Sequence, residues 1–235
     1  MAKLPHYHED PHTLHIGTET PRAYFIPYDS ACKAKSGNRG ASAFVKSLCG
    51  EWNFKYYKNE TEVESFTVGG VEFSDRMTVP MNLQVKLDAG YDVPNYTNVN
   101  YPYPQDPPYV PDENPCALYQ RTFQIEAKVL AEKEIYLNFE GVDTCFYLYI
   151  NGSFVGYSQV AHMTSEFAVS KFLHAGDNDI RVLVFKWSDG SYLKTRICGE
   201  CPVSSAKCIF STATRHTSPT SKSQRTLRTT SPPPM

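Results

Sequence analysis

The sequence predicts an all-β protein, and two features indicate this class. Short runs rich in β-branched and aromatic residues recur between turn signals, as expected of strands. These runs cover residues 50–57, 119–125, 134–140, 145–150, 154–157 and 179–187. No long amphipathic helix is evident, because only residues 41–48 and 165–173 have a helical or mixed pattern. An antiparallel β-sandwich of two sheets is therefore favoured over an α/β fold.

The first of these runs, residues 50–57, alternates well between apolar and polar side chains. Gly69 and Gly70 then indicate a turn that leads into another strand over residues 71–73.

A β-hairpin is the most secure local prediction. Asn151 and Gly152 separate two strand-like runs, and both residue types tolerate the positive φ of a two-residue type I′ turn. A second turn is expected at residues 175–178. In residues 135–139 and 180–187 polar and apolar side chains alternate imperfectly, which is typical of a strand with one face on a core.

Residues 90–115 form a segment rich in Pro, Tyr and Asn, which we expect to be an extended loop. Tyrosine offers flat faces and hydroxyl groups, which suit the lining of a sugar site. Loop segments of this composition more commonly pack on a protein's surface or contact a partner. Residue types alone therefore leave both uses open and favour packing.

The charge of the chain is unevenly distributed. The net charge is −2, but residues 194–235 hold seven Lys and Arg against one acidic residue, Glu200. Ser, Thr and Pro make up 20 of these 42 residues, which predicts a disordered basic tail. The tail lacks interleaved aromatic residues, so we expect no nucleic-acid partner.

No stretch approaches the roughly 18 apolar residues of a membrane-spanning helix, and the first residues show no apolar leader. The chain has seven cysteines, an odd number that favours free thiols over a disulfide framework. We therefore expect a cytoplasmic protein with no membrane partner.

Several separate motifs point to one family. They are residues 14–28 (LHIGTETPRAYFIPY), 90–99 (GYDVPNYTNV), 107–111 (PPYVP), 113–115 (ENP) and 187–193 (WSDGSYL). Over about residues 5–193 the chain resembles the amino-terminal region of the large bacterial β-galactosidases of glycoside hydrolase family 2. Many motifs in the same order are far more specific than any one of them.

The resemblance implies a galactose-binding-like jelly-roll β-sandwich with an extended amino-terminal arm. The expected divisions are an arm over residues 1–40, a jelly-roll sugar-binding domain over 41–193 and the tail over 194–235. In the family the asparagine that corresponds to Asn98 contacts the bound galactose, so Asn98 is the predicted substrate-binding residue. The arm, roughly residues 5–28, belongs to subunit contacts in similar enzymes, which implies a homo-oligomer.

The resemblance ends after Leu193, where a family member would continue with a segment like EDQDMWR and then SGIFR. If one G is restored after the Leu193 codon, codons that the genetic code permits for residues 194–209 read EDQDMWRMSGIFREVY. We therefore expect residues 194–235 to be an out-of-frame translation, with the closing strand of the sandwich lost and a sheet edge exposed.

No catalytic residue is predicted in this chain. The resemblance places both catalytic glutamates in a barrel of roughly 250 residues, more than the whole chain contains. The Glu113-Asn114-Pro115 motif has a different order from a catalytic Asn-Glu-Pro. Four further carboxylates are expected to be solvated turn residues: Glu140, Asp143, Glu166 and Asp189.

No metal ligand or cofactor is predicted in this chain either. The resemblance implies magnesium ligands in the barrel and a sodium ligand in the out-of-frame segment. Two sets of residues are candidate metal ligands: Cys198, Cys201, Cys208 and His216 in the tail, and His6, His8, His12 and His15 near the start. The first set departs from zinc spacing, and prolines interrupt the second, which is expected on an exposed arm.

Three functions follow from these observations. The first is a fragment of a β-galactosidase, inactive alone, whose intact enzyme hydrolyses galactosides. The second is a free-standing carbohydrate-binding module that uses Asn98, Tyr96, Tyr101 and Tyr103. The third is an interaction protein with a basic tail.

Overall fold

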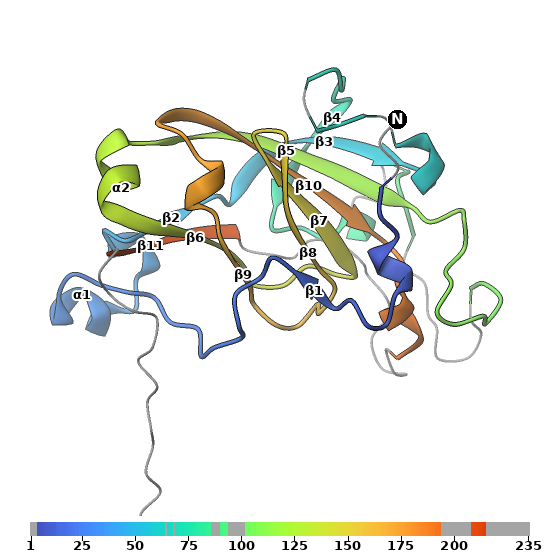
Figure 1. The fold of residues 1–235 in the computed structure, drawn as a ribbon, viewed down its shortest axis with the longest axis horizontal. Helices are drawn as coiled ribbons and strands as arrows, with labels where there is room; N and C mark the ends of the chain where they lie inside the picture. Colours follow the sequence, from blue (N-terminus) through green and yellow to red (C-terminus); the bar gives the residue numbers. More distant parts are fainter. Residues whose placement is uncertain are drawn as a thin grey trace, which may run out of the picture.

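A computed structural model describes residues 4–63, 65–67, 69–85, 90–93, 102–193 and 208–214. Two antiparallel sheets face each other in a β-sandwich (Figure 1). The sequence prediction of a predominantly antiparallel two-sheet architecture is therefore confirmed.

The larger sheet has seven strands and the smaller sheet has four. In spatial order the larger sheet contains β1 (His15–Ile16), β8 (Ser153–Ser158), β7 (Cys145–Ile150), β10 (Gly176–Phe185), β5 (Cys116–Ile125), β3 (Gly50–Tyr57) and β4 (Asp75–Val79). The smaller sheet contains β2 (Val45–Ser47), β11 (Cys208–Thr214), β6 (Lys133–Phe139) and β9 (Ser165–Ala168). The helices are α1 (Ala31–Ser36), α2 (Ala127–Glu132) and the 3-10 turns η1 (Tyr7–Glu9), η2 (Arg39–Ala41), η3 (Glu60–Glu62), η4 (Leu83–Val85), η6 (Ser170–Phe172) and η7 (Asp189–Tyr192).

The predicted hairpin is present between β7 and β8. Asn151 has φ of 50° and Gly152 has φ of 80°, the left-handed values that a type I′ turn requires. Ile150 pairs with Ser153 directly beside the turn.

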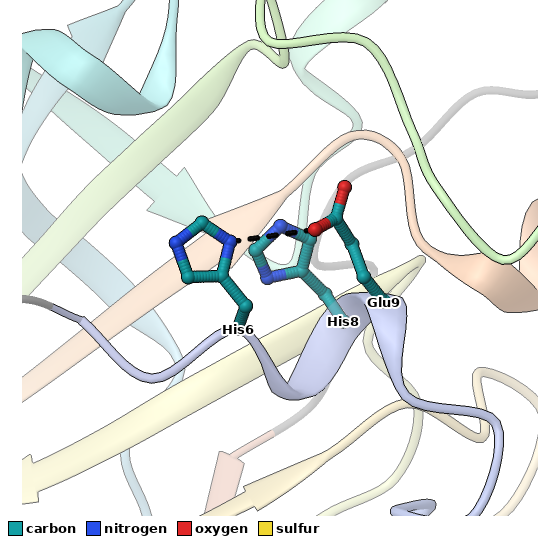
Figure 2. Close-up of side chains that lie close together, drawn as sticks. All are labelled: His6, His8 and Glu9. Atoms are coloured by element: carbon teal, nitrogen blue, oxygen red, sulfur yellow. Dashed lines mark ion pairs between the residues drawn. The ribbon is translucent and has the colours of Figure 1, made fainter.

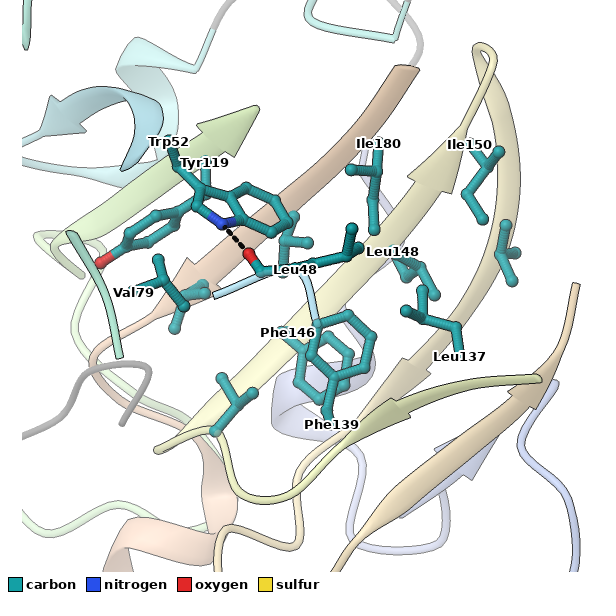
Figure 3. Packing of buried hydrophobic residues seen from close by; sticks show 14 of the residues in the cluster. Leu48, Trp52, Val79, Tyr119, Leu137, Phe139, Phe146, Leu148, Ile150 and Ile180 are labelled. Atoms are coloured by element: carbon teal, nitrogen blue, oxygen red, sulfur yellow. Dashed lines mark hydrogen bonds between the residues drawn. The ribbon is translucent and has the colours of Figure 1, made fainter. Parts of the chain in front are cut away.

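The space between the sheets holds the inner core, which aromatic and aliphatic side chains fill (Figure 3). Its members include Trp52, Leu137, Phe139, Phe146, Leu148, Phe167, Val182 and Val184. The Trp52 indole N–H donates to the Leu48 carbonyl oxygen at 2.8 Å, so the one polar atom of this large side chain is satisfied within the core.

A second set of buried side chains, the outer cluster, lies on the opposite face of the larger sheet. It consists of Tyr57, Phe66, Cys116, Leu118, Cys145, Tyr147, Tyr149, Tyr157, Leu183 and Phe185. Val182 and Val184 of β10 belong to the inner core, whereas Leu183 and Phe185 belong to the outer cluster. The expectation that β10 buries only one face is therefore wrong, and its imperfect alternation reflects burial on both faces.

The arm covers part of this outer face. Leu4, Tyr7 and Ile16 pack against the outer cluster, and β1 extends the larger sheet by pairing with β8. The backbone amide of Glu19 also donates to the Glu166 carbonyl oxygen at 2.7 Å. The arm is thus held to the sandwich of its own chain.

The pattern at residues 41–48 predicted helical or mixed structure, and this prediction is wrong for most of the segment. The structure has the end of η2 there, followed by strand β2, because pairing with a neighbouring strand outweighs the weak local preference. The mixed pattern at 165–173 resolves into β9 and η6. The short helices α1 and α2 were not predicted, since six residues leave little periodicity to detect.

The prediction of disorder over residues 194–235 is wrong at Cys208–Thr214, which form β11. This strand pairs with β2 on one side and β6 on the other, so the smaller sheet is continuous where a missing strand was expected. Without β11, the facing edges of β2 and β6 would have unpaired backbone N–H and C=O groups. An extended segment with β-branched and apolar residues can pair with both edges, and residues 208–214 are such a segment. The other residues of the predicted tail lie outside the described residues.

Candidate functional site

Asn98, the predicted substrate-binding residue, lies outside the described residues, as do Tyr96 and Tyr101. The chain on both sides of residues 94–101 is described. Contacts of these flanking residues fix where the loop begins and ends.

The beginning of the loop is held by a buried ion pair. The Lys186 ammonium lies 2.7 Å from the Asp92 carboxylate, and the two side chains are only 7% and 9% exposed. The second Asp92 oxygen accepts a hydrogen bond from the Gln84 amide at 2.8 Å. Buried charges are tolerated only when paired in this way, so Asp92 is held at a defined position.

The end of the loop is held by aromatic contacts. The ring of Tyr103 meets the rings of Trp187 and Tyr192 edge to face, with centroids 5.2 and 5.8 Å apart. The Tyr192 hydroxyl donates to the Tyr109 carbonyl oxygen at 2.6 Å. Tyr103 therefore anchors the chain, and this packing leaves it poorly suited to the sugar stacking expected of a free-standing module.

Both anchors sit on neighbouring residues, Lys186 and Trp187, directly after β10. Asn114 fixes this point, because its side-chain amide donates to the Trp187 carbonyl oxygen at 3.0 Å and accepts from the Trp187 amide at 2.9 Å. The Lys186 amide donates to the Pro115 carbonyl oxygen at 2.9 Å. The Glu113-Asn114-Pro115 motif thus positions the end of β10.

The two anchors stand on either side of Asn98 in the sequence, although Asn98 itself lies outside the described residues. Sequence reasoning found Asn98 through its motif but missed Lys186, Asp92 and Asn114. The only signal available for these anchors was their position within or beside the quoted motifs.

The expectation that the four remaining carboxylates are solvated is wrong for two of them. Glu166 is buried and accepts from both the Nε and an Nη of Arg22, at 2.7 and 2.6 Å. Asp189 is buried in η7, and its burial raises the pKa of this carboxyl above the usual value. Glu140 forms an ion pair with Arg39. Arg22 belongs to the arm, so its bond to Glu166 joins the arm to the smaller sheet.

The cysteines are consistent with the expectation of free thiols. Cys32, Cys49, Cys116 and Cys145 form no disulfide bond. Cys198, Cys201 and His216 lie outside the described residues, and only the backbone of Cys208 is described. None of the helices in the part of the chain that the structure describes has the length and apolar character needed to span a bilayer.

Comparison with known proteins identifies the family to which this fold belongs. The model of the glycosyl hydrolases family 2 sugar-binding domain matches residues 45–207, more than half of the chain. The chain belongs to this family.

The most similar relatives include two β-galactosidases. The protein from Actinobacillus pleuropneumoniae is 46% identical over 191 residues, which are 81% of this chain and 18% of the relative. The protein from Staphylococcus xylosus is 39% identical over 194 residues, which are 80% of this chain and 18% of the relative. The chain therefore spans less than a fifth of the length of these relatives, and the predicted resemblance to a part of a family 2 β-galactosidase is confirmed.

Solved structures support the fold. A Bacteroides uniformis β-glucuronidase aligns with a TM-score of 0.51 and 18% identity, over 72% of this chain and 18% of that one. A Bifidobacterium dentium β-glucuronidase complexed with coumarin-3-O-glucuronide gives a TM-score of 0.50 and 17% identity, over 72% of this chain and 30% of that one.

Proposed function

We propose that this chain supplies the sugar-binding sandwich of a β-galactosidase and presents Asn98 to a galactoside whose site is completed by a separate catalytic barrel. The observation that carries the proposal is the double anchoring of the 94–101 loop at Lys186 and Trp187. The identity to β-galactosidases supports galactosides as the substrate class. In this proposal the magnesium and sodium ions of the intact enzymes bind residues outside this chain.

Hydrolysis at a retaining site needs two carboxyl groups about 5–5.5 Å apart, one as acid/base and one as nucleophile. The buried carboxylate of Glu166 is already bound on both oxygens by Arg22, and Glu140 pairs with Arg39. We therefore expect the purified chain to release no product from a nitrophenyl β-galactoside. Turnover that persists after host enzyme is excluded would contradict the proposal.

Calorimetry with galactose separates this proposal from the free-standing module. We expect no measurable binding by the chain alone, because the barrel supplies most of the site. Saturable binding that Asn98→Ala abolishes and that Asn95→Ala, a nearby amide in the same loop, leaves unchanged would favour the module instead.

The proposal also covers the cellular location and the assembly of the protein. The cytoplasm is proposed because the four cysteines whose side chains are described form no disulfide bond, and thiols stay reduced there. Assembly through the arm is proposed from the family resemblance, and sedimentation of the chain with and without residues 1–28 tests it. A sedimentation coefficient that reports a monomer for the full chain would contradict assembly.

We also propose that residues 194–235 are read out of frame relative to the family. The composition of this segment and the permitted codons of residues 194–209 support the proposal. The nucleotide sequence tests it directly, because the neighbouring frame must encode EDQDMWRMSGIFREVY.

A further inference from the structure

The four histidines near the start of the chain do not all lie on an exposed arm. His8 is buried and stacks on the ring of Phe185, with centroids 4.7 Å apart. His6, His8 and Glu9 each direct one metal-binding atom into a common space, and these atoms lie within 4.8 Å of one another (Figure 2).

A fourth ligand atom comes from a different part of the chain. Glu60, at the start of η3, places one carboxylate oxygen 3.1 Å from His8 Nε2 and the other 3.6 Å from His6 Nε2. Glu9 lies 3.4 Å from His6 Nδ1. Two imidazoles from the arm and two carboxylates, one from the arm and one from η3, therefore converge.

The hydrogen bonds of Tyr147 determine which nitrogen of His8 carries a proton. The single Tyr147 hydroxyl proton is donated to the Pro5 carbonyl oxygen at 2.7 Å. His8 Nδ1 lies 3.1 Å from the same hydroxyl oxygen and must therefore donate to it.

This arrangement leaves the Nε2 lone pair of His8 directed toward the Glu60 carboxylate. A lone pair and an anionic oxygen 3.1 Å apart repel each other unless a cation, either a proton or a metal ion, lies between them. A histidine that ligates a metal with one nitrogen and donates a hydrogen bond with the other is the usual arrangement at protein metal sites.

One of the distances fits a shared zinc ion directly. Zinc bonds to imidazole nitrogen and carboxylate oxygen are about 2.0–2.2 Å long, so two such ligands at a tetrahedral angle lie about 3.4 Å apart. His8 Nε2 and one Glu60 oxygen are separated by 3.1 Å. His6 meets Glu9 through Nδ1 at 3.4 Å and the other Glu60 oxygen through Nε2 at 3.6 Å, so only one of these two contacts can belong to the ion, and the exposed His6 ring has to turn as the ion binds.

The surroundings are also suitable for an ion. One Glu9 oxygen accepts from the Val110 amide at 3.1 Å, which fixes the carboxylate and leaves the other oxygen for the metal. His6, Glu9 and Glu60 line a cavity, so the site is accessible from one side while His8 closes the other.

We propose that His6, His8, Glu9 and Glu60 form a zinc site that clamps the amino-terminal arm to the loop after β3. A mixed set of imidazole and carboxylate ligands suits Zn²⁺. Mg²⁺ and Ca²⁺ are disfavoured, because they prefer sites made only of oxygen ligands. The clamp lies over the outer cluster, where it holds η1 against η3.

The test uses the full chain, treated with a chelator, dialysed and titrated with ZnCl₂ in a calorimeter. We expect one zinc ion per chain and a melting temperature that rises with zinc concentration, because zinc binds the folded state. His6→Gln and Glu60→Gln should each weaken binding at least about 10-fold and abolish the thermal shift.

His12→Gln is the matched control, because His12 is an exposed histidine of the same arm outside the cluster. It should bind zinc like the parent chain. All variants keep every cysteine, so zinc held by thiols would persist in His6→Gln and Glu60→Gln. Unchanged binding in those variants, equal weakening by His12→Gln, or no zinc binding at all would each overturn the proposal.

Discussion

The larger sheet is buried on both faces, but the two faces are covered by different kinds of structure. The inner core lies against another sheet and is closed by aliphatic and phenylalanine side chains such as Leu148 and Phe146. The outer cluster is covered by the arm and by irregular chain after β3, and it contains four tyrosines and two cysteines.

The difference lies in how each face is fixed. The inner core depends on close packing between two regular surfaces, and packing contacts are not directional as hydrogen bonds are. The outer cluster also has a directional bond to its cover, from the Tyr147 hydroxyl to the Pro5 carbonyl oxygen of the arm at 2.7 Å. An irregular cover can shift, so its position has to be set by hydrogen bonds.

A matched pair of substitutions gives the largest expected effect and compares the two faces directly. Leu148 in the inner core and Leu183 in the outer cluster are both 0% exposed. Leu148→Ala should lower the free energy of unfolding by about 3–5 kcal/mol, because two sheets cannot close around the cavity. Leu183→Ala should cost about 2–3 kcal/mol, because the arm can settle into the space.

Urea denaturation monitored by tryptophan fluorescence measures both values. An equal loss for the two variants, or a larger loss for Leu183→Ala, would show that the outer cover is as rigid as the inner one.

A smaller effect is expected where the arm joins the larger sheet. A Cβ atom on Gly156 would lie 2.1 Å from the Ile16 carbonyl oxygen and 2.7 Å from the Phe167 ring. Gly156→Ala should therefore separate β1 from β8 and cost about 1–3 kcal/mol.

Hydrogen exchange is the appropriate measurement for this variant. Amides in the β1–β8 pair should exchange faster, whereas those in the β3–β4 pair at the opposite edge serve as the internal control. Unchanged protection of β1 would mean that the arm is not held at this contact.

The smallest effect concerns pH. Burial lowers the pKa of His15, on β1, below its ordinary value of 6.5. The folded state therefore favours neutral His15, and this contribution to stability is present above pH 6.5 and is lost as the pH falls through the lowered pKa. His15→Gln removes the titration and can still bond to the Ser158 hydroxyl, which His15 Nδ1 meets at 3.0 Å.

Melting temperatures of the two proteins should differ least above pH 6.5, and the parent chain should lose stability relative to His15→Gln on acidification. A difference that stays constant with pH would show that His15 does not titrate across the transition.

The two faces of the sheet also show which features local sequence could predict and which it could not. The strand β7 and the type I′ turn after it were predicted with correct bounds, because a run of aromatic and β-branched residues and the Asn151-Gly152 pair are local signals. The position of β10 was predicted, but not its second buried face. That face is covered by residues of the arm such as Tyr7, which lie far away in the sequence.

The candidate site likewise has parts that the sequence predicted and parts that only the structure revealed. The motif around Asn98 identified the loop and the family, whereas the anchors at Lys186 and Trp187 required a structure. The burial of His8 and its contact with Glu60 could likewise not be predicted from sequence. The prolines near the arm's histidines do not indicate which imidazole ring is buried.

The sequence by itself determined that this protein consists of strands joined by specific turns, and its motifs identified the family. Tertiary structure alone decided which polar groups are buried, how the arm closes the outer face, and that Cys208–Thr214 takes a place between β2 and β6. The physical reason is that strand formation follows from neighbouring residues, whereas burial and pairing depend on whatever distant segment meets them in the folded chain.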